Sequence, residues 1–460
     1  MAELLDHEKH LIPSTPEAEG IPSAAIRKFI GDCLAAGSDL HGVLLVRHGR
    51  AAFSAFFDPY RPEDKRHVYS VSKSWTATAV GLAAAEGKLS LTDKVTSFFP
   101  EDCPDKISGN LAGMEVRHLL SMSCGHETEP KAPDGGMTWV QAFLRHPVPF
   151  QPGTHFLYNS MGSYMLSAIL QKATGEKVVD YLKPRLFEPL GITGVTWDCS
   201  PEGICCGGWG IHVSAEDVAK LGMVYLNGGV FEGRRILSAE WVREATSMQI
   251  DNSPNVQKDW EQGYCYQIWR CQHNCFRFDG AYGQYMAAMP EKDAVLVVFS
   301  STACMQVVLD SLWENLLPAM GDAPLPEDAE GFPEYRCRLP ELEGRDFAAD
   351  YSCGENEEDF RALSVRTGQN GGELRIETAG GELTIPFARN RWQRAALRTE
   401  NGHLEGLYGI AGGWDGGGLT VILRHLESPH TYQFRLRTSA PASLTVTFRE
   451  SDGEVRIPLS

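Results

Sequence analysis

The spacing of hydrophobic and polar residues changes several times along the 460-residue chain, and each change marks an expected element. Residues 42–57 contain two apolar runs around a short His-Gly-Arg turn, which predicts a β-hairpin. Residues 71–86 are rich in small apolar side chains and stop before Gly87, which predicts a buried helix. From about 90 to 250 the apolar residues recur near a period of 3.6, as in 162–175, so this stretch is expected to be mainly helical.

Strand patterns return at residues 276–290 and 294–301, and a further helical pattern follows at 307–317. Strands at both ends of a segment whose middle is helical imply that the two ends meet in one sheet. The pattern therefore predicts the α/β fold class for residues 1–320, with sheet and helices in one mixed domain and a helical insertion.

The character of the chain changes after residue 320. Residues 321–334 are rich in proline, glycine and acidic residues, which is typical of a linker. Residues 335–460 contain several short alternating strands, two of them introduced by the same Gly-Gly-Glu-Leu sequence. This final segment is predicted to be an all-β sandwich or barrel with an accessory role.

Composition narrows the choice of partners and location. The net charge of −18 argues against nucleic acid and against anionic membranes as partners. No run of about 18 apolar residues and no secretion signal is evident, so the protein is expected in the cytoplasm with its twelve cysteines reduced. Cys265, Cys271, His273 and Cys275 lie close in sequence, but their spacing matches no zinc pattern. Neither a metal nor another cofactor is expected.

The candidate chemistry begins at Ser70 and Lys73, which share a Ser-x-x-Lys spacing at the start of the predicted buried helix. This spacing places the lysine about one turn above the serine on the same helix face. Burial favours a neutral amine, which can accept the serine proton, and the Ser70 N–H can donate to an oxyanion. A serine before a helix is also an ordinary N-cap, so the motif needs partners to indicate catalysis.

Further motifs supply those partners. Residues 68–95, 116–126, 152–175 and 208–242 together resemble the serine β-lactamase-related hydrolases, a family that includes class C β-lactamases, D-alanyl-D-alanine peptidases and esterases. The resemblance covers about residues 15–318 and implies a mainly antiparallel sheet flanked by helices. It also implies that Ser70 is the nucleophile and Lys73 its proton acceptor.

The family's Tyr-x-Asn motif corresponds to Tyr158-Asn159-Ser160. The resemblance implies that Tyr158 lies close to the serine and lysine, and that Ser160 replaces the family's asparagine. A core aromatic residue is the alternative for Tyr158. We expect its phenol to relay a proton to the leaving group, with a pKa lowered by Lys73.

The third family motif, usually Lys-Thr-Gly or His-x-Gly, corresponds to Phe278-Asp279-Gly280. Gly280 leaves room for substrate along the strand, and the Ala281 N–H is the expected second oxyanion donor. Phe278 replaces the basic residue that helps to hold a substrate carboxylate in β-lactam-processing members. Arg277 is expected on the opposite strand face from Phe278, while Asp279 faces either the site or a neighbouring loop.

Other polar and aromatic residues near these motifs are weaker candidates for the active site. His118 and His126 are interpreted as structural, because a Ser-Lys-Tyr scheme needs no histidine. Glu127 does not fit the pattern of the water-activating glutamate in class A β-lactamases. Trp139 and Trp209 either line a substrate cleft or pack in the core.

The sequence therefore predicts a serine hydrolase that acts through an acyl-enzyme on a small ester, amide or peptide substrate. A true β-lactamase or D-Ala-D-Ala peptidase is one alternative, and a catalytically silent binding protein is another. The aromatic residue at position 278 favours neutral substrates over those that carry a carboxylate.

Overall fold

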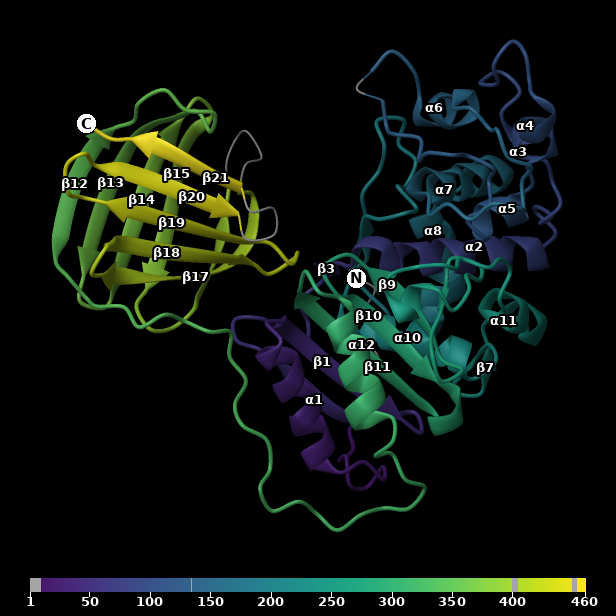
Figure 1. Cartoon of the computed structure of the whole chain (residues 1–460), viewed down its shortest axis with the longest axis horizontal. Helices are drawn as coiled ribbons and strands as arrows, with labels where there is room; N and C mark the ends of the chain where they lie inside the picture. The colour runs from purple at the N-terminus through teal and green to yellow at the C-terminus, as the bar shows by residue number, and fades with distance from the viewer. Residues whose placement is uncertain (1–9, 134, 399–403, 449–452) are drawn as a thin grey trace, which may run out of the picture. The chain divides into compact units, whose positions relative to one another are not determined.

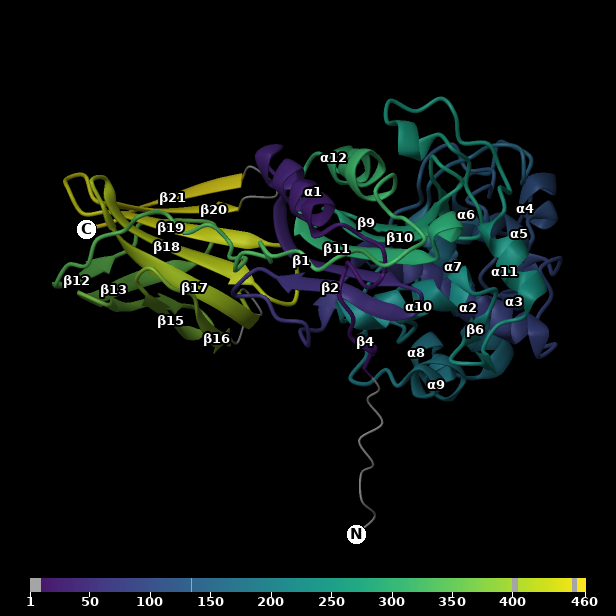
Figure 2. The ribbon, with the colours of Figure 1, turned by 90° about the horizontal axis from the view of Figure 1, so that it is seen from below.

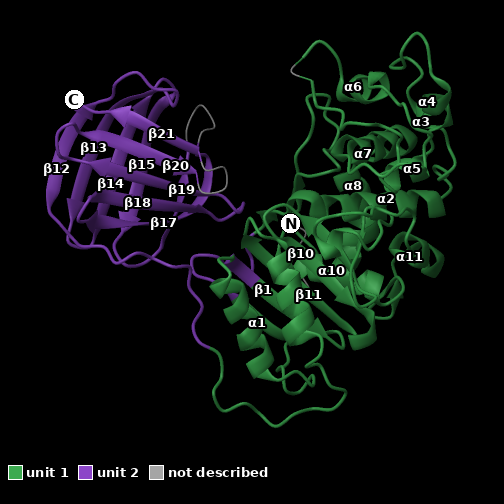
Figure 3. Cartoon of the chain, viewed as in Figure 1, with its two compact units in different colours: residues 1–38, 43–55, 65–332 green, residues 39–42, 56–64, 333–460 purple. Residues whose placement is uncertain are grey.

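A computed structural model describes residues 10–133, 135–398, 404–448 and 453–460. The chain divides into two compact units, coloured separately in Figure 3. The first comprises residues 1–38, 43–55 and 65–332. The second comprises residues 39–42, 56–64 and 333–460, so two short N-terminal segments belong with the C-terminal part. Each unit is described by itself below.

A six-stranded sheet forms the centre of the first unit (Figure 1), with strand order β2-β1-β11-β10-β9-β8. Its strands are β1 (Asp39–Arg47), β2 (Arg50–Phe56), β8 (Trp269–Arg270), β9 (Phe276–Gly280), β10 (Gln284–Met289) and β11 (Ala294–Ser301). β1 lies beside β11, which confirms that strands from the two ends of this region meet in one sheet. β8, β9, β10 and β11 pair antiparallel in succession.

Helices cover both faces of this sheet. Figure 2 shows α1 (Ser23–Ala35) and α12 (Gln306–Ser311) on one face and α10 (Ala215–Leu226) on the other, where α10 contacts β10 and β11. A capping box is present at the start of α10, since the Ser214 side chain accepts from Asp217 N and the Asp217 side chain accepts from Ser214 N. A buried face on α10 and a capped start fix its position over the sheet.

The helical insertion lies between β2 and β8 in sequence. It contains α2 (Ser72–Ala85), α3 (Val95–Phe98), α4 (Gly109–Gly113), α5 (Val116–Leu120), α6 (Trp139–Arg145), α7 (Ser160–Thr174), α8 (Val178–Leu182), α9 (Glu188–Leu190), α10 and α11 (Ala239–Thr246). Most residues of α2 are buried, and this helix packs against α7 and α8. Its small side chains allow this close packing, as the sequence predicted.

The second unit is a curled β-sheet that closes on itself. Its strands are β12 (Phe347–Ser352), β13 (Phe360–Gly368), β14 (Gly371–Thr378), β15 (Gly381–Ala388), β16 (Gln393–Leu397), β17 (Gly406–Asp415), β18 (Gly418–His425), β19 (Thr431–Arg437), β20 (Ser443–Phe448) and β21 (Gly453–Pro458). Ser352 at the end of β12 exchanges two backbone hydrogen bonds with Ser460, and Cys353 pairs with Leu459. The alternating strands point their apolar residues inward, and of the two predicted forms the structure is the barrel.

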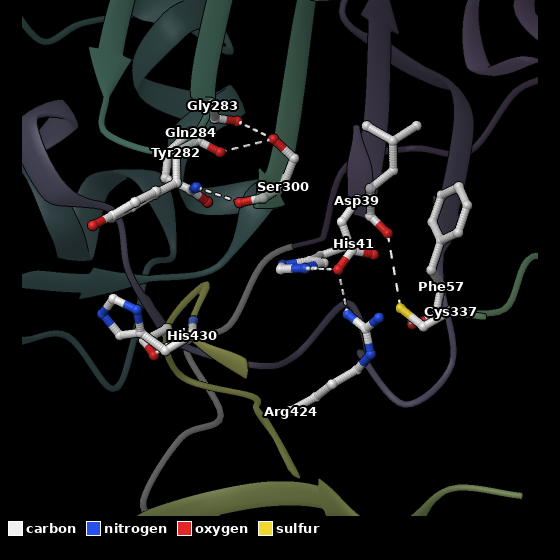
Figure 4. A network of polar contacts seen from close by, with 12 residues as sticks. Asp39, His41, Phe57, Tyr282, Gly283, Gln284, Ser300, Cys337, Arg424 and His430 are labelled. Carbon is white, nitrogen blue, oxygen red and sulfur yellow. Dashed lines mark hydrogen bonds and ion pairs between the residues drawn. The ribbon is translucent and has the colours of Figure 1, made fainter. Parts of the chain in front are cut away.

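Two arginines of the second unit form ion pairs with its two N-terminal segments, residues 39–42 and 56–64. Arg424 donates to Asp39 at 2.6 Å, and His41 lies beside the same carboxylate (Figure 4). Burial raises the pKa of Asp39, but His41 and Arg424 outweigh it and hold that pKa well below its usual value. Arg394 binds both carboxylate oxygens of Asp64, at 2.6 and 3.1 Å. The second unit therefore depends on residues that precede the helical insertion.

Candidate active site

Ser70 lies in a short 3₁₀ turn, η1 (Tyr69–Val71), that leads directly into α2. Tyr69 has a φ of 51°, a left-handed conformation that side-chain-bearing residues rarely adopt. Ser70 is half-buried. The turn thus presents this serine at the base of a buried helix, as the Ser-x-x-Lys spacing predicted.

Lys73 extends from the first turn of α2 toward three oxygen atoms. Its Nζ lies 3.0 Å from Ser70 Oγ, 3.2 Å from Ser160 Oγ and 2.8 Å from the carbonyl oxygen of Gly208. A neutral amine has two N–H groups and one lone pair. It can therefore donate to Ser160 and Gly208 while its lone pair accepts the proton of Ser70.

Burial makes the neutral amine accessible near physiological pH. Lys73 is only 1% exposed, and the loss of hydration lowers its pKa from 10.5 to about 7. The negative charges of Glu129 and Asp279 act in the opposite direction and raise that pKa. Since desolvation outweighs both carboxylates, Lys73 can act as a base at pH 7.

Tyr158 lies beside the same amine. Lys73 Nζ is 4.8 Å from the centre of the Tyr158 ring, which stacks on Trp269 at a centroid distance of 5.3 Å. Burial raises the pKa of Tyr158 well above 10, although a hydrogen bond with Ser70 acts to lower it. The expectation of a lowered pKa was wrong, because the desolvated ring also lies near Asp279 and Glu129, which disfavour a phenolate. Tyr158 is a neutral phenol.

Ser160 begins α7 immediately after Tyr158. The Asn159 side chain caps this helix by accepting from Gly162 N at 3.0 Å, and its amide nitrogen lies 3.2 Å from His126 Nδ1. Glu129 Oε1 accepts from Ser160 N at 2.5 Å. Sequence reasoning missed Glu129, since no motif marks it and only the folded loop brings its carboxylate to the start of α7.

The end of β9 approaches the backbone at Ser70. A Cβ on Gly280 would lie 2.3 Å from the carbonyl oxygen of Val68 and 3.4 Å from Ser70 N, so only glycine fits there. Ala281, the next residue, is exposed at the turn between β9 and β10. The structure therefore brings Gly280 close to Ser70, as the alignment of the third motif predicted.

Phe278 is not brought to the site. Its side chain is fully buried, and its ring packs edge-on against Tyr225 of α10 at 5.6 Å. The prediction that Phe278 offers an apolar face to substrate was wrong, because strand alternation directs this residue into the core. Position 278 therefore cannot set the charge preference of the site.

Arg277 and Asp279 share the opposite face of β9. Arg277 Nε donates to Asp279 Oδ2 at 2.8 Å, and the guanidinium lies over Trp260 and Trp269. Burial raises the pKa of Asp279 despite this ion pair, and the charge of Asp279 acts on both Lys73 and Tyr158. Asp279 thus belongs to the electrostatic surroundings of the site, with Arg277 neutralising part of its charge.

The remaining candidates lie in structural settings. His118 Nδ1 accepts from Glu115 N at 3.0 Å and caps α5. His126 is fully buried, and burial lowers its pKa to about 4, so it is neutral. Trp139 and Trp209 are half-buried and contact each other at a centroid distance of 5.7 Å.

In the part of the chain that the structure describes, no group of three or more His, Cys, Asp or Glu side chains is arranged to hold a metal ion. Within the same residues, no helix combines the length and apolar character needed to cross a bilayer.

Comparison with known proteins defines the class. The β-lactamase family matches residues 15–315, so the chain belongs to this family. The chain is an enzyme, a serine hydrolase of the β-lactamase fold with an additional all-β unit.

Two curated relatives and one solved structure illustrate its similarity. The 6-aminohexanoate-dimer hydrolase of Paenarthrobacter ureafaciens is 25% identical over 287 residues, which cover 56% of this chain and 71% of that protein. A putative D-alanyl-D-alanine carboxypeptidase of Escherichia coli is 26% identical over 24% of this chain, and the match spans only 28% of that relative. The octameric penicillin-binding protein homologue from Pyrococcus abyssi shares the fold, with a TM-score of 0.52, 17% identity, and coverage of 95% of this chain and 99% of that one.

Proposed function

We propose that the protein hydrolyses a small amide, peptide or ester through an acyl-enzyme on Ser70. The observation that carries this proposal is the buried amine of Lys73, which lies 3.0 Å from Ser70 Oγ and has a pKa of about 7. A serine hydroxyl becomes a useful nucleophile only when a base takes its proton. Lys73 satisfies this requirement at neutral pH without a histidine.

The first half of the reaction forms the acyl-enzyme. Lys73 Nζ takes the proton from Ser70 Oγ, and Oγ forms a bond with the substrate carbonyl carbon. The N–H groups of Ser70 and Ala281 stabilise the oxyanion, since the close approach of Gly280 to Ser70 N brings these two segments together. When the tetrahedral intermediate collapses, the bond to the leaving nitrogen or oxygen breaks.

Tyr158 carries the proton that the leaving group requires. As a neutral phenol it donates its own proton to the leaving group and is reprotonated from Lys73, so no phenolate persists. Water then attacks the acyl carbonyl, gives a proton to Lys73, and releases the acid product with the proton returned to Ser70. This second half restores all three groups.

The surroundings favour substrates without a negative charge near the scissile bond. Glu129 and Asp279 both place carboxylates close enough to influence Lys73, and Arg277 is already paired with Asp279. The similarity to a 6-aminohexanoate-dimer hydrolase supports an amide substrate. A β-lactamase or D-Ala-D-Ala peptidase is the alternative supported by the family itself.

Labelling tests the proposal directly. A fluorophosphonate probe should modify Ser70, and peptide mapping should locate the adduct there and lose it in Ser70→Ala. The unlabelled enzyme should then be assayed with a panel of neutral amides, peptides, esters and penicillins. An adduct on Ser160, or none on the folded protein, contradicts the assignment, and the latter result favours a silent binding protein. Penicillin turnover that matches the best amide would favour the β-lactamase.

A further inference from the structure

A small hairpin, residues 198–206, places two cysteines directly opposite each other. Cys206 N donates to Asp198 O at 2.8 Å, and Ser200 N donates to Ile204 O at 2.8 Å. Cys199 and Cys205 form the residue pair between these two bonds. Cys199 and Cys205 therefore lie opposite each other at a non-hydrogen-bonded position of the antiparallel pair, with the two backbone hydrogen bonds on either side of them.

This position suits a disulfide. Opposed residues at non-hydrogen-bonded positions have Cα atoms about 4.5 Å apart. Disulfides accept Cα separations of about 4.4–6.8 Å. The Sγ atoms of Cys199 and Cys205 are 3.9 Å apart, so rotation of the side chains is enough to bring them to bonding distance without moving the backbone.

The two thiols differ in access. Cys199 is exposed to solvent, whereas Cys205 is fully buried. We propose that Cys199 and Cys205 are a thiol-oxidation site that forms a reversible disulfide. The Cys199 thiol reacts with the oxidant to form a sulfenic acid, and the Cys205 thiol then attacks this sulfenic acid to form the disulfide. The formation of this bond does not depend on the proposed hydrolytic mechanism.

The chemistry balances with hydrogen peroxide as the oxidant. The Cys199 thiolate attacks one peroxide oxygen, which gives a sulfenic acid and hydroxide. Cys205 then attacks the sulfenic sulfur, the S–S bond forms, and the sulfenic oxygen leaves as water with the Cys205 proton. Burial raises the pKa of the Cys205 thiol to about 12, which makes Cys205 the slower and therefore the second partner.

The hairpin precedes the segment that holds the catalytic lysine. Gly207 O accepts from Thr76 Oγ1 at 2.8 Å, and Gly208 O accepts from Lys73 Nζ at 2.8 Å. A Cβ on Gly208 would lie 2.8 Å from the backbone oxygen of Ser160, so this segment is held tightly between α2 and α7. A disulfide between residues 199 and 205 closes a short ring next to it. We expect the oxidised enzyme to keep its activity and to resist thermal inactivation longer than the reduced enzyme.

Mass spectrometry of the full chain tests the proposal. After treatment with hydrogen peroxide, free thiols are blocked with N-ethylmaleimide and the chain is cut after Glu202, between the two cysteines. The fragment ending at Glu202 and the fragment beginning at Gly203 should remain joined, with two hydrogens lost, and should separate on reduction. Cys206→Ser should retain the link and Cys199→Ser should lose it. Because Cys199 is exposed, that substitution should leave the fold intact.

Several outcomes would overturn the proposal. Separate fragments after oxidation would do so when the exposed thiol of Cys304 in the same sample is oxidised, since that thiol reports that the oxidant acted. A bond between Cys205 and Cys206, found within the second fragment, would do so as well. The half-life at elevated temperature should be at least about twofold longer after oxidation in the unmodified protein and in Cys304→Ser. Equal half-lives, or the same gain in Cys199→Ser, would refute the link between oxidation and stability.

Discussion

Replacing Lys73 with methionine should abolish activity and change stability with a sign that depends on pH. Methionine fills a similar volume but carries no charge. In the native protein the buried amine has a pKa of about 7, whereas an unfolded lysine titrates near 10.5. Between these values the unfolded chain binds the extra proton, so the native state of the unmodified protein gains stability as pH rises.

The size of the effect follows from the two pKa values. Each pKa unit corresponds to about 1.4 kcal/mol, so the buried amine costs about 4 kcal/mol at pH 7 and about 1 kcal/mol at pH 9.5. Methionine removes this cost. It also removes the hydrogen-bond partner of Ser70, Ser160 and the Gly208 carbonyl, which costs roughly 1–3 kcal/mol. Lys73→Met should therefore be more stable than the unmodified enzyme at pH 7, and equally or less stable at pH 9.5.

Scanning calorimetry at the two pH values measures the difference in stability between Lys73→Met and the unmodified enzyme. The unfolding transition that shifts on substitution is assigned to the first unit. The exposed lysine variant Lys88→Met is the control and should show no such pH dependence. A stability difference between Lys73→Met and the unmodified protein that stays constant from pH 7 to 9.5 would mean that the amine is charged when buried. The same reasoning predicts an acid limb near pH 7 in kcat/KM, with activity rising as Lys73 loses its proton.

Three further substitutions test other parts of the site. Tyr158→Phe should lower kcat about a hundredfold, and its combination with Lys73→Ala should cost much less than the product of the single losses, as steady-state kinetics can show. Gly280→Ala should lower kcat/KM by about a hundredfold, because its Cβ meets the backbone oxygen of Val68 and displaces the segment beside Ser70. Glu129→Gln should move the acid limb of kcat/KM to lower pH. The negative charge of Glu129 raises the pKa of Lys73, so removing that charge lowers this pKa.

Matched variants separate these effects from general damage. Gly109→Ala introduces a Cβ that meets no atom within 4 Å and should retain full activity. Glu127→Gln removes a neighbouring exposed carboxylate and should leave the acid limb in place. Full activity in Tyr158→Phe would show that the second motif is misassigned. An acid limb that moves to higher pH in Glu129→Gln would contradict the electrostatic role of Glu129.

The parts of the site that depend on local spacing could be predicted from the sequence. Ser70 and Lys73 are separated by one helical turn, so any helix that begins there brings them together. The strand patterns of β1 and β11 predicted one shared sheet, because apolar strands at both ends of a helical segment need each other. These inferences required only periodicity and the geometry of one helix.

The failures concern residues whose environment is set by distant parts of the chain. Alternation along β9 places Phe278 opposite Arg277 and Asp279, but only the position of α10 decides which face is core. The pKa of Tyr158 depends on how much water the folded site excludes, which no motif records. Glu129 reaches α7 through a loop without periodicity.

The ion pair between Asp39 and Arg424 has a consequence for synthesis on the ribosome. The two residues are 385 positions apart in the chain. At translation rates of about 5–20 residues per second, roughly 20–80 s pass between the synthesis of Asp39 and that of Arg424. The interval between the synthesis of Asp64 and that of Arg394 is almost as long. The segments 39–42 and 56–64 therefore complete these contacts only after residues 394 and 424 have been made, and a nascent chain arrested before residue 394 carries two carboxylates without these arginines. Chaperone dependence should be greatest in that interval.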